Sequence, residues 1–296
     1  MPQGLGRGFV PNWLHGYYND LSAKVNWVGP VDQDGIPLDI DQATQPHYFI
    51  TPIIQKALGH WDMALLNGAE RQVHQQQFLS LCEWAVANQD ACGGWPIWFL
   101  IDQPGFRSPY SAMAQGEAAS ALVRAYELTH DERYYTSARR SIELMLTPVG
   151  EGGTARCTGD GGLVLEEFVQ NPPNTILNGW IFALYGLYDF LLMEEEWALR
   201  QALDNTVQTL IALLPGYNAG FWSWYDTRHT ICTPFYHALH IAQLRALAKT
   251  FPQHATAIKA TLHQFEVQNE SRLNQLRAIQ LKIFQKLVHP PLVVQR

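Results

Sequence analysis

Two neighbouring stretches of the sequence concentrate residues that can move protons and hold a carboxylate. The first is Phe221-Trp222-Ser223-Trp224-Tyr225-Asp226-Thr227-Arg228-His229, and Tyr236 and His240 follow it. Tyr236 and His240 are four residues apart, so on a helix they share one face. The Arg228 guanidinium is a planar fork that matches a carboxylate in bidentate fashion. Each of these side chains can also serve as a buried structural residue, but their density favours a functional site.

A second concentration holds two adjacent carboxylates, Glu166 and Glu167, with Asn174 and Asn178 downstream. A glutamate in a loop can act as a general acid or a general base. Neighbours in sequence seldom face the same point, so we expect at most one of the two to face a ligand. A solvated pair of loop glutamates is the alternative. Asn174 is well placed to cap a helix that runs from Ile176.

A third concentration follows Gly93-Gly94-Trp95-Pro96-Ile97 and includes Arg107, Tyr110 and Gln115. Tryptophan and tyrosine side chains on loops are suited to stacking against sugar rings, and packing of the loop over the core is the alternative. The sequence contains no GxGxxG, Walker, GxSxG or HExxH motif, so nucleotide or zinc chemistry is unsupported.

A metal site is also not expected. His237 and His240 have a spacing that could hold a metal ion, but no third ligand with a typical spacing accompanies them. The four cysteines are sparse and form no CxxC pair. We therefore expect neither a metal nor another cofactor.

Four helical hairpins are predicted to position these residues. From about residue 48 to 265 the apolar spacing is mostly helical, and long β-type alternation is missing. Comparable positions in the four segments (Trp61, Tyr126, Tyr188 and Leu244) lie 65, 62 and 56 residues apart. That period exceeds the roughly 33 to 47 residues of common two-helix solenoids, and it fits hairpins separated by functional loops. We predict an all-α fold, with hairpins in an incomplete α/α barrel or toroid; a plain helical bundle is the alternative.

The flanking segments differ from this helical region, and we predict three parts. Residues 1–45 are rich in turns and are expected to form an extended arm with a hairpin near Asp32 to Gly35; residues 46–265 form the catalytic domain. Within 266–296, an amphipathic helix from Arg272 to Val288 has an apolar face made by Leu273, Leu276, Ile283, Phe284 and Leu287. We expect it to dock on its own domain, with a homodimer contact or a weak peripheral membrane contact as alternatives.

Composition limits the class of protein. Of 296 residues, 47% are hydrophobic and 16% charged, which excludes intrinsic disorder. The net charge of −7 disfavours binding to nucleic acid. No run of 18 apolar residues and no signal-peptide core occur. We therefore expect a reduced, soluble, cytoplasmic protein, and the 12% of aromatic residues suggests stacking surfaces for a ring-shaped ligand.

Several of these motifs together resemble the D-glucuronyl C5-epimerase family. The family's signature is matched by Ser111 to Tyr126. The whole resemblance extends from about Tyr48 to Leu247, with the motifs in the same order. The matching segments are Asn88-Gln89-Asp90, Gly93 to Ile97, Glu166-Glu167, Leu177-Asn178-Gly179, Gly186-Leu187-Tyr188-Asp189, Tyr225 to His229 and Tyr236 to His240. Such ordered agreement is more specific than any single motif.

The resemblance implies a helical catalytic domain, metal-independent chemistry and conversion of D-glucuronate to L-iduronate within a polysaccharide. It implies that Tyr225 and Tyr236 are acid/base tyrosines and that Glu167 is the nearby glutamate. Two differences stand out. The animal enzymes have a tyrosine after the paired glutamates, where this chain has Phe168, and only about residues 68–77 stand where they have a large β-sheet module.

A mechanism follows from these residues. Arg228, helped by Asn178 or a protonated Glu167, neutralises the uronate carboxylate, and Tyr236 and Tyr225 are the candidate base and acid. Because Phe168 stands in place of a tyrosine, Glu167 or a histidine is the alternative for the second role. His229, His240, Glu166, Trp95, Arg107, Tyr110 and Gln115 are the candidate substrate contacts. The alternatives are a uronate lyase on the same scaffold, a glycoside hydrolase that uses Glu166 and Glu167, and an inactive carbohydrate-binding protein.

Overall fold

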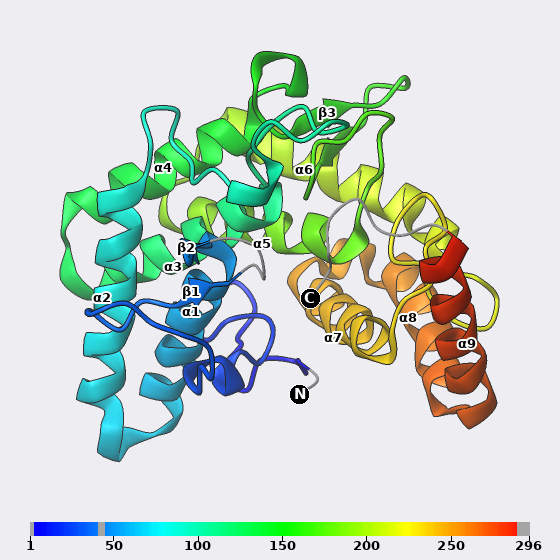
Figure 1. Cartoon of the computed structure of the whole chain (residues 1–296), viewed down its shortest axis with the longest axis horizontal. Helices are drawn as coiled ribbons and strands as arrows, with labels where there is room; N and C mark the ends of the chain where they lie inside the picture. Colours follow the sequence, from blue (N-terminus) through cyan, green and yellow to red (C-terminus); the bar gives the residue numbers. More distant parts are fainter. Residues whose placement is uncertain (1–2, 41–44, 289–296) are drawn as a thin grey trace.

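The computed structural model describes residues 3–40 and 45–288, and this part of the chain is mostly helical (Figure 1). Its α-helices are α1 (Ile50–Leu66), α2 (Arg71–Asn88), α3 (Ala112–Thr129), α4 (Glu132–Leu146), α5 (Leu177–Met193), α6 (Trp197–Leu213), α7 (Pro234–Thr250), α8 (Ala255–Glu270) and α9 (Arg272–Val288). The first eight form the four predicted hairpins, so the predicted all-α class is confirmed.

The first helix of each hairpin is the inner one. α1, α3, α5 and α7 pack side by side in that order (Figure 1). Most residues of α3 and α5 are buried, whereas α2, α4, α6 and α8 keep an exposed face. Within the described residues, α1 and α7 are not in broad contact with each other, so the row of inner helices is open between its two ends.

Two glycines let α3 and α5 approach closely. A Cβ added to Gly186 would lie 2.2 Å from the carbonyl oxygen of Gly116. A Cβ added to Gly116 would lie 2.6 Å from the Cα of Ala183. No larger side chain fits at either position without moving a backbone, so glycine is required for the crossing of these two helices.

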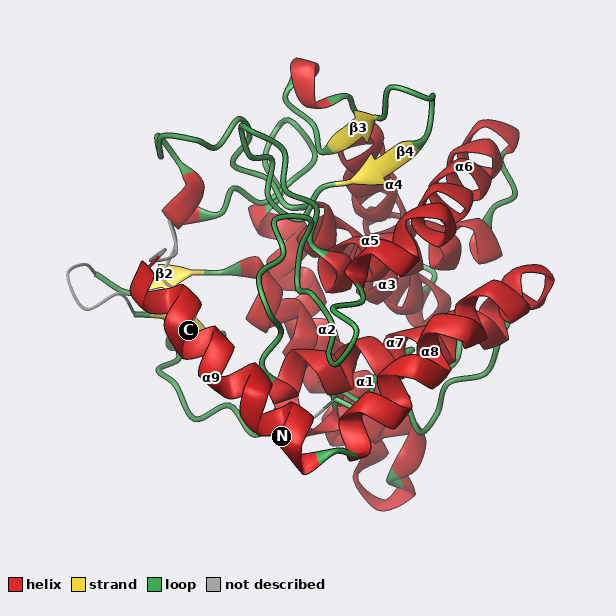
Figure 2. Ribbon diagram, turned by 90° about the vertical axis from the view of Figure 1, so that its right-hand side faces the viewer, coloured by secondary structure: helices red, strands yellow, loops and turns green. Residues whose placement is uncertain are grey.

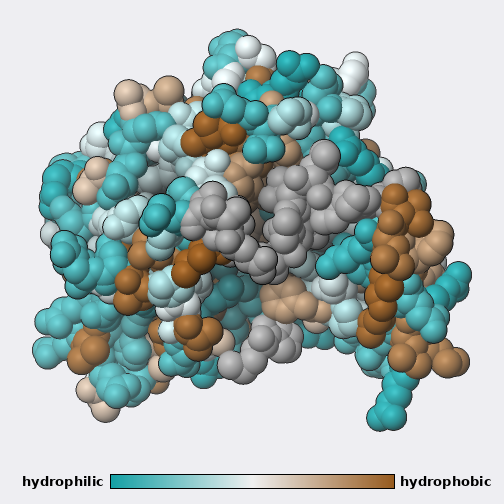
Figure 3. Space-filling model, viewed as in Figure 1, coloured by the Kyte–Doolittle hydropathy of each residue, from teal (hydrophilic) through white to brown (hydrophobic). Residues whose placement is uncertain are grey.

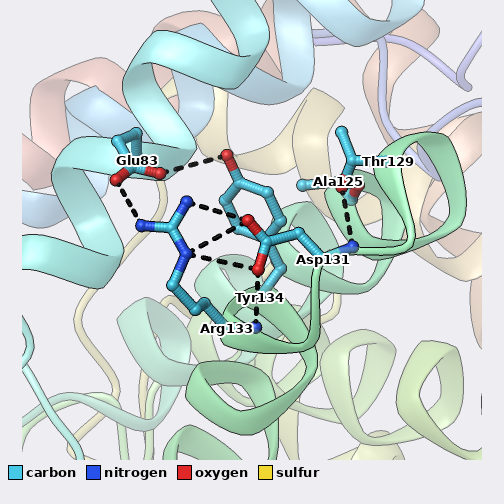
Figure 4. A network of polar contacts seen from close by, with 6 residues as sticks. All are labelled: Glu83, Ala125, Thr129, Asp131, Arg133 and Tyr134. Atoms are coloured by element: carbon cyan, nitrogen blue, oxygen red, sulfur yellow. Dashed lines mark hydrogen bonds and ion pairs between the residues drawn. The ribbon is translucent and has the colours of Figure 1, made fainter.

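The turn between α3 and α4 ties the second hairpin to the first (Figure 4). α3 ends at Thr129, and His130 takes the left-handed conformation with φ of 57°. Asp131 then caps α4 by accepting a hydrogen bond from the backbone N–H of Arg133 (3.0 Å). The Arg133 guanidinium bridges Asp131 and Glu83 of α2, 2.8 Å from each. These exposed ion pairs contribute little to stability, but they join α2 to α4.

The N-terminal segment packs into the protein core. The Tyr18 ring stacks on Tyr185 of α5 at 3.8 Å between centroids, and its hydroxyl donates to Asp189 (2.8 Å). Tyr17 and Leu21 are also fully buried. A turn at Asp32–Gly35 is closed by a hydrogen bond from the Gly35 N–H to the Asp32 carbonyl (3.2 Å), near the predicted hairpin. The segment therefore covers α1 and α5 and does not extend freely from them.

The described strands are two short antiparallel pairs. β1 (Leu38–Asp39) pairs with β2 (His47–Tyr48). β3 (Ala155–Cys157) pairs with β4 (Leu163–Leu165) with Ala155 opposite Leu165. β4 runs directly into Glu166 and Glu167, so this hairpin fixes the start of the loop that carries them.

The C-terminal helix α9 has the predicted bounds but docks through an unpredicted face. Ala278 is fully buried, and Lys282 is 9% exposed. Gln285 accepts a hydrogen bond from the Ile231 N–H (2.8 Å) and donates one to the His229 carbonyl (2.9 Å). The predicted apolar face points to solvent instead, as the apolar stripe on the right of Figure 3 shows. The helix docks on its own domain through Ala278, Leu281 and Gln285, which contact the loop before α7, rather than through the predicted apolar face.

Within residues 3–40 and 45–288, none of the helices is long and apolar enough to cross a membrane.

Candidate active site

The long loops and α9 enclose a cavity of about 1140 Å³. In Figure 2 these loops run between α9 and the inner helices. The lining comes from the N-terminal segment, the amino-terminal halves of α1, α3, α5 and α7, the loops before α3, α5 and α7, and the inner side of α9. Residues from both ends of the chain therefore meet around one space.

Backbone pairing between loops fixes the walls of the cavity. The Leu177 N–H donates to the Tyr225 carbonyl and the Thr227 N–H to the Thr175 carbonyl, both at 3.1 Å. The Arg107 N–H donates to the Val169 carbonyl (2.8 Å). Each site loop is thus hydrogen-bonded to another, which restrains the side chains that they carry.

Two tyrosines lie in contact on one wall. The rings of Tyr225 and Tyr236 meet edge to face, with centroids 4.8 Å apart. Thr233 caps α7 and Pro234 starts it, which places Tyr236 in the first turn of the helix. Burial and the nearby Glu167 carboxyl raise the pKa of Tyr236 to about 12, and a hydrogen bond from Tyr225 opposes that rise. The two phenols therefore form one hydrogen-bonded unit rather than two separate groups.

Glu167 lies at the amino end of α5 as a buried carboxyl. Burial raises its pKa to about 8, so at neutral pH it carries a proton. A Cβ on Gly179 would lie 2.1 Å from Oε2 of Glu167, so the glycine makes room for the carboxyl. Among the described residues, Oε2 has no hydrogen-bond partner. Within the described part of the chain, Glu167 therefore lines the cavity with a carboxyl that has one unpaired, buried oxygen.

Arg228 and Asn178 bring hydrogen-bonding groups to the same cavity. The turn that carries Arg228 is held by Asp226, whose Oδ1 accepts from the backbone N–H groups of Arg228 (3.1 Å) and Thr230 (2.9 Å). Asn174 donates to the other oxygen of Asp226 (3.1 Å). Asn174 therefore supports this turn and lines the cavity, and does not cap α5 as the sequence suggested.

Beneath Glu167 lies a second buried carboxyl, Glu117 of α3. Gln55 of α1 donates to both of its oxygens (3.1 and 3.3 Å). Burial raises the pKa of Glu117 to about 8, with the Glu167 charge adding to the rise and Lys24 and the Gln55 hydrogen bond opposing it. Gln55 and Lys24 both line the cavity. Glu117 thereby holds the amide of Gln55 in place at the cavity wall.

An aromatic wall surrounds Phe168. Its ring meets Phe99 and Phe106 edge to face, with centroids 6.2 and 6.3 Å away. All three rings line the cavity, together with Trp98. Since aromatic faces and edges bind the apolar faces of sugar rings, this wall is suited to holding a sugar.

Several residues that the sequence predicted in the site lie outside the cavity. Glu166 is fully buried and forms an ion pair with Arg156 (2.8 Å), and it lies outside the cavity lining, unlike Glu167. His240 is fully buried behind Tyr236, where its Nδ1 lies 3.2 Å from the Ser223 hydroxyl.

The other expected contacts also lie outside the lining. Tyr110 donates to Asp90 (2.5 Å), and the Trp95 indole donates to the Ala85 carbonyl (2.9 Å). Gln115 is fully buried and donates to the Gly93 carbonyl (3.1 Å). Arg107 and His229 are exposed beside the site. Trp95, Tyr110 and Gln115 therefore hold the loop before α3 in place.

Sequence reasoning missed other lining residues because no local pattern distinguishes them. Gln55 sits in an apolar stretch of α1, and Lys24 sits in a turn-rich segment. Lys282 lies on α9, with its ammonium group 5.7 Å from the centroid of the Tyr225 ring. Its basic side chain was a visible signal, but only the docking of α9 turns it toward the cavity.

Across the described part of the chain, no group of three or more His, Cys, Asp or Glu side chains is arranged to hold a metal ion.

Comparison with known proteins finds sequences that are similar to this chain. Residues 89–266 match the sequence model of a family described as D-glucuronyl C5-epimerase C-terminus. The chain is 31% identical over 205 residues to D-glucuronyl C5-epimerase of Caenorhabditis elegans, covering 60% of this chain and 33% of that protein. It is 29% identical over 193 residues to an uncharacterised protein of Methanocaldococcus jannaschii, covering 60% of this chain and 63% of that protein. The chain thus aligns with about a third of the first relative and under two thirds of the second.

Proposed function

Since the chain belongs to the D-glucuronyl C5-epimerase family, we propose that it inverts C5 of D-glucuronate residues in a polysaccharide or oligosaccharide and gives L-iduronate. The observation that carries this proposal is the convergence of Glu167, Tyr225 and Tyr236 with Arg228 and Asn178 on one cavity. Proton abstraction next to a carboxylate needs an acid, a base and a group that holds the carboxylate, and these residue types supply all three.

The first requirement is to stabilise the charge that develops on the substrate. Removing the C5 proton of a uronate moves negative charge onto its carboxylate, which becomes an enediolate. Arg228 is suited to bind that group through two parallel N–H donors, and the Asn178 amide adds another polar group. A donor of this kind contributes about 10²–10³ in rate, because it binds the charge-rich intermediate better than the substrate.

The second requirement is an acid and a base on opposite faces of C5. Tyr225 and Tyr236 share a hydrogen bond, so we assign the pair to one face, with Tyr236 as the base. Burial raises the pKa of Tyr236 to about 12, so the neutral phenol is its resting form. The hydrogen bond from Tyr225 and the amino end of α7 favour the phenolate that forms when Tyr236 acts as the base. Tyr236 takes the C5 proton, and a proton from the other face completes the inversion.

We assign Glu167 to that other face. Phe168 has no proton to give, and the described structure places His229 and His240 outside the cavity lining. Glu167 holds a proton at neutral pH, so it can deliver that proton to C5 and become a carboxylate. Exchange with solvent then restores Glu167 and Tyr236, and the two exchange roles in the reverse direction.

The size and lining of the cavity support a substrate of several sugars. Its volume of about 1140 Å³ exceeds the roughly 300–1,000 Å³ of typical small-molecule sites. Lys24, Lys282 and Lys286 add cationic groups around it. A chain of uronates offers both the negative charges and the rings that this lining accommodates.

The position of Glu166 argues against a glycoside hydrolase. Such enzymes need two carboxyls on opposite sides of one glycosidic bond. Glu166 is instead fully buried against Arg156, outside the lining. Of the two glutamates, the proposed epimerase reaction uses only Glu167, which lines the cavity.

The test is NMR of heparosan, a polymer with 4-linked glucuronate, incubated with the protein in D₂O while absorbance near 230 nm is followed. We expect deuterium at C5, new iduronate signals and constant absorbance. Carboxyl-reduced heparosan serves as the matched control and should take up no deuterium, because it cannot form the enediolate.

Three results would contradict the proposal. Growing absorbance would show that the intermediate expels the 4-linked sugar, which is a lyase reaction. Binding of heparosan without deuterium uptake would show an inactive carbohydrate-binding protein. Deuterium uptake without iduronate would show that the proton returns only to the face it left.

A further inference from the structure

The outer face of α9 carries an apolar stripe that packs against nothing in the described structure. Its large members, all at least half exposed, are Leu273, Leu276, Ile283, Phe284, Leu287 and Val288, with exposed fractions from 50 to 79%. They recur at spacings of three, four and seven residues and so lie on one side of the helix (Figure 3). Scattered apolar residues on a surface are ordinary, but a contiguous exposed stripe marks an interaction surface.

This exposure does not arise from a loosely attached helix. The opposite side of α9 is fixed by Ala278, which is fully buried, and by both hydrogen bonds of Gln285. The Arg277 guanidinium lies 3.9 Å from the centroid of the Phe221 ring. Because this opposite side of α9 is docked on the domain, the apolar stripe points to solvent.

The charge on α9 identifies the partner. Between Arg272 and Val288 there are four basic residues and no acidic one. The chain as a whole carries a net charge of −7, so the charge of this helix has the opposite sign to that of the chain. Arg272, Arg277 and Lys286 are exposed and border the stripe. A helix with an apolar face and basic edges is suited to lie in the interface of an anionic membrane.

A second copy of the chain fits this stripe less well. A 17-residue helix is about 25 Å long, and a face about 10 Å wide gives roughly 250 Å², well below the roughly 800 Å² per partner of a stable interface. Two copies joined stripe to stripe would also bring together two sets of the exposed positive charges of Arg272, Arg277 and Lys286. We infer that the outer face of α9 binds a membrane surface that contains anionic lipid.

Lys282 and Lys286 also line the cavity, so one helix serves both surfaces. Membrane binding would hold the cavity close to the lipid headgroups. This inference concerns binding alone and stands independently of the reaction that the cavity catalyses.

The test is co-sedimentation of the full chain with vesicles of phosphatidylcholine alone and of phosphatidylcholine with phosphatidylglycerol. We expect sedimentation with the anionic vesicles at about 0.1 M salt, and binding about tenfold weaker with the neutral vesicles or at about 0.5 M salt. Replacing two stripe residues in Leu276→Ser/Leu287→Ser should weaken binding at least about tenfold, because two large apolar side chains no longer enter the lipid.

The matched control is Val73→Ser/Trp197→Ser, which removes two exposed apolar side chains from α2 and α6 (58% and 73% exposed). It should bind like the unmodified protein. Both variants should keep the circular dichroism melt of the unmodified protein. The inference fails if the unmodified protein does not bind anionic vesicles, if it binds neutral vesicles equally well, or if the stripe variant binds unchanged. A dimer in sedimentation velocity that the stripe variant alone converts to monomer, without vesicle binding, would assign the stripe to a second copy.

Discussion

Tyr236 lies in the first turn of α7, where its ring contacts Tyr225 and lines the cavity. If it is the base, replacing its hydroxyl in Tyr236→Phe should lower kcat by about 10²–10⁴ while KM changes little. The NMR assay with heparosan in D₂O measures this change. The free energy of unfolding should stay within about 1 kcal/mol, because only one hydroxyl is lost.

Tyr126→Phe is the matched control for Tyr236→Phe. The Tyr126 hydroxyl donates to Glu132 (3.2 Å) at the surface of the second hairpin and lies outside the cavity lining. Its rate should equal that of the unmodified protein. Full activity of Tyr236→Phe would remove Tyr236 from the mechanism.

The pKa of Glu167 sets how the reaction rate depends on pH near and above pH 8. Burial raises its pKa to about 8, so the protonated form persists through neutral pH and is lost as the pH rises past about 8. The reaction needs this proton on Glu167 and a phenolate on Tyr236, whose pKa is about 12. The rate should therefore rise about tenfold for each pH unit up to about 8 and stay level from there to about 9.5. In Glu167→Gln the amide cannot give up a proton, so the rate should fall by about 10² or more at every pH. Rates measured from pH 6 to 9.5 test both statements.

The neighbouring Glu166→Gln is the comparison for this profile. Because Glu166 faces Arg156 outside the cavity lining, its variant should keep the same change of slope near pH 8, even if the protein unfolds more readily. A rate that keeps rising tenfold per pH unit from 8 to 9.5 in the unmodified protein, or a Glu167→Gln rate equal to that of the unmodified protein, would exclude Glu167 as the acid.

At the scale of elements, the crossing of α3 and α5 sets the positions of the site residues. Gly186→Ala would place a Cβ 2.2 Å from the Gly116 carbonyl oxygen, so the two helices must move apart. We expect a loss of about 3 kcal/mol or more in the free energy of unfolding, since overpacking of backbone against backbone cannot be relieved by a side-chain rotation. Urea unfolding measures this loss.

Gly68→Ala controls for the general effect of adding a methyl group. No atom lies within 4 Å of the Cβ it would add, and Gly68 does not require a left-handed conformation. Its unfolding free energy should change by no more than about 0.5 kcal/mol. If the unfolding free energy of Gly186→Ala changes as little, the close approach of α3 and α5 does not require glycine at position 186.

At the scale of the whole molecule, buried carboxyls link stability to pH. Glu117 and Glu167 have pKa values of about 8 in the folded protein and near 4.5 when unfolded. Between these values the folded state binds more protons, so stability falls as the pH rises. From pH 6.5 to 8, the ionisation of each carboxyl should cost about 1–2 kcal/mol of stability.

Glu117→Gln isolates one of these contributions. The amide is neutral at every pH and can keep a hydrogen bond with Gln55, so the loss of stability between pH 6.5 and 8 should shrink by about 1–2 kcal/mol. Urea unfolding at the two pH values provides the comparison. An unchanged loss in the variant would mean that Glu117 does not titrate in this range.

The sequence by itself determined the helices and the residue types that are candidates for the chemistry. The apolar spacing located four hairpins and the bounds of α9, because helix formation depends on local propensity and on the periodicity of one face. The density of Tyr225, Arg228 and Tyr236, and the single carboxyl expected to face a ligand, pointed to residues that meet in one cavity. These features are readable because each depends on residues that are close in sequence.

Only the tertiary structure decided which side chains reach that cavity and which do not. Gln55 and Lys282 are more than 200 residues apart, and they meet at the cavity because α1 and α9 enclose it from different sides. His240 shares a helix with Tyr236 but is buried against Ser223, and the apolar face of α9 points outward. The choice between core, cavity and solvent depends on which surfaces pack against each helix, and this is set by contacts between segments that are distant in sequence.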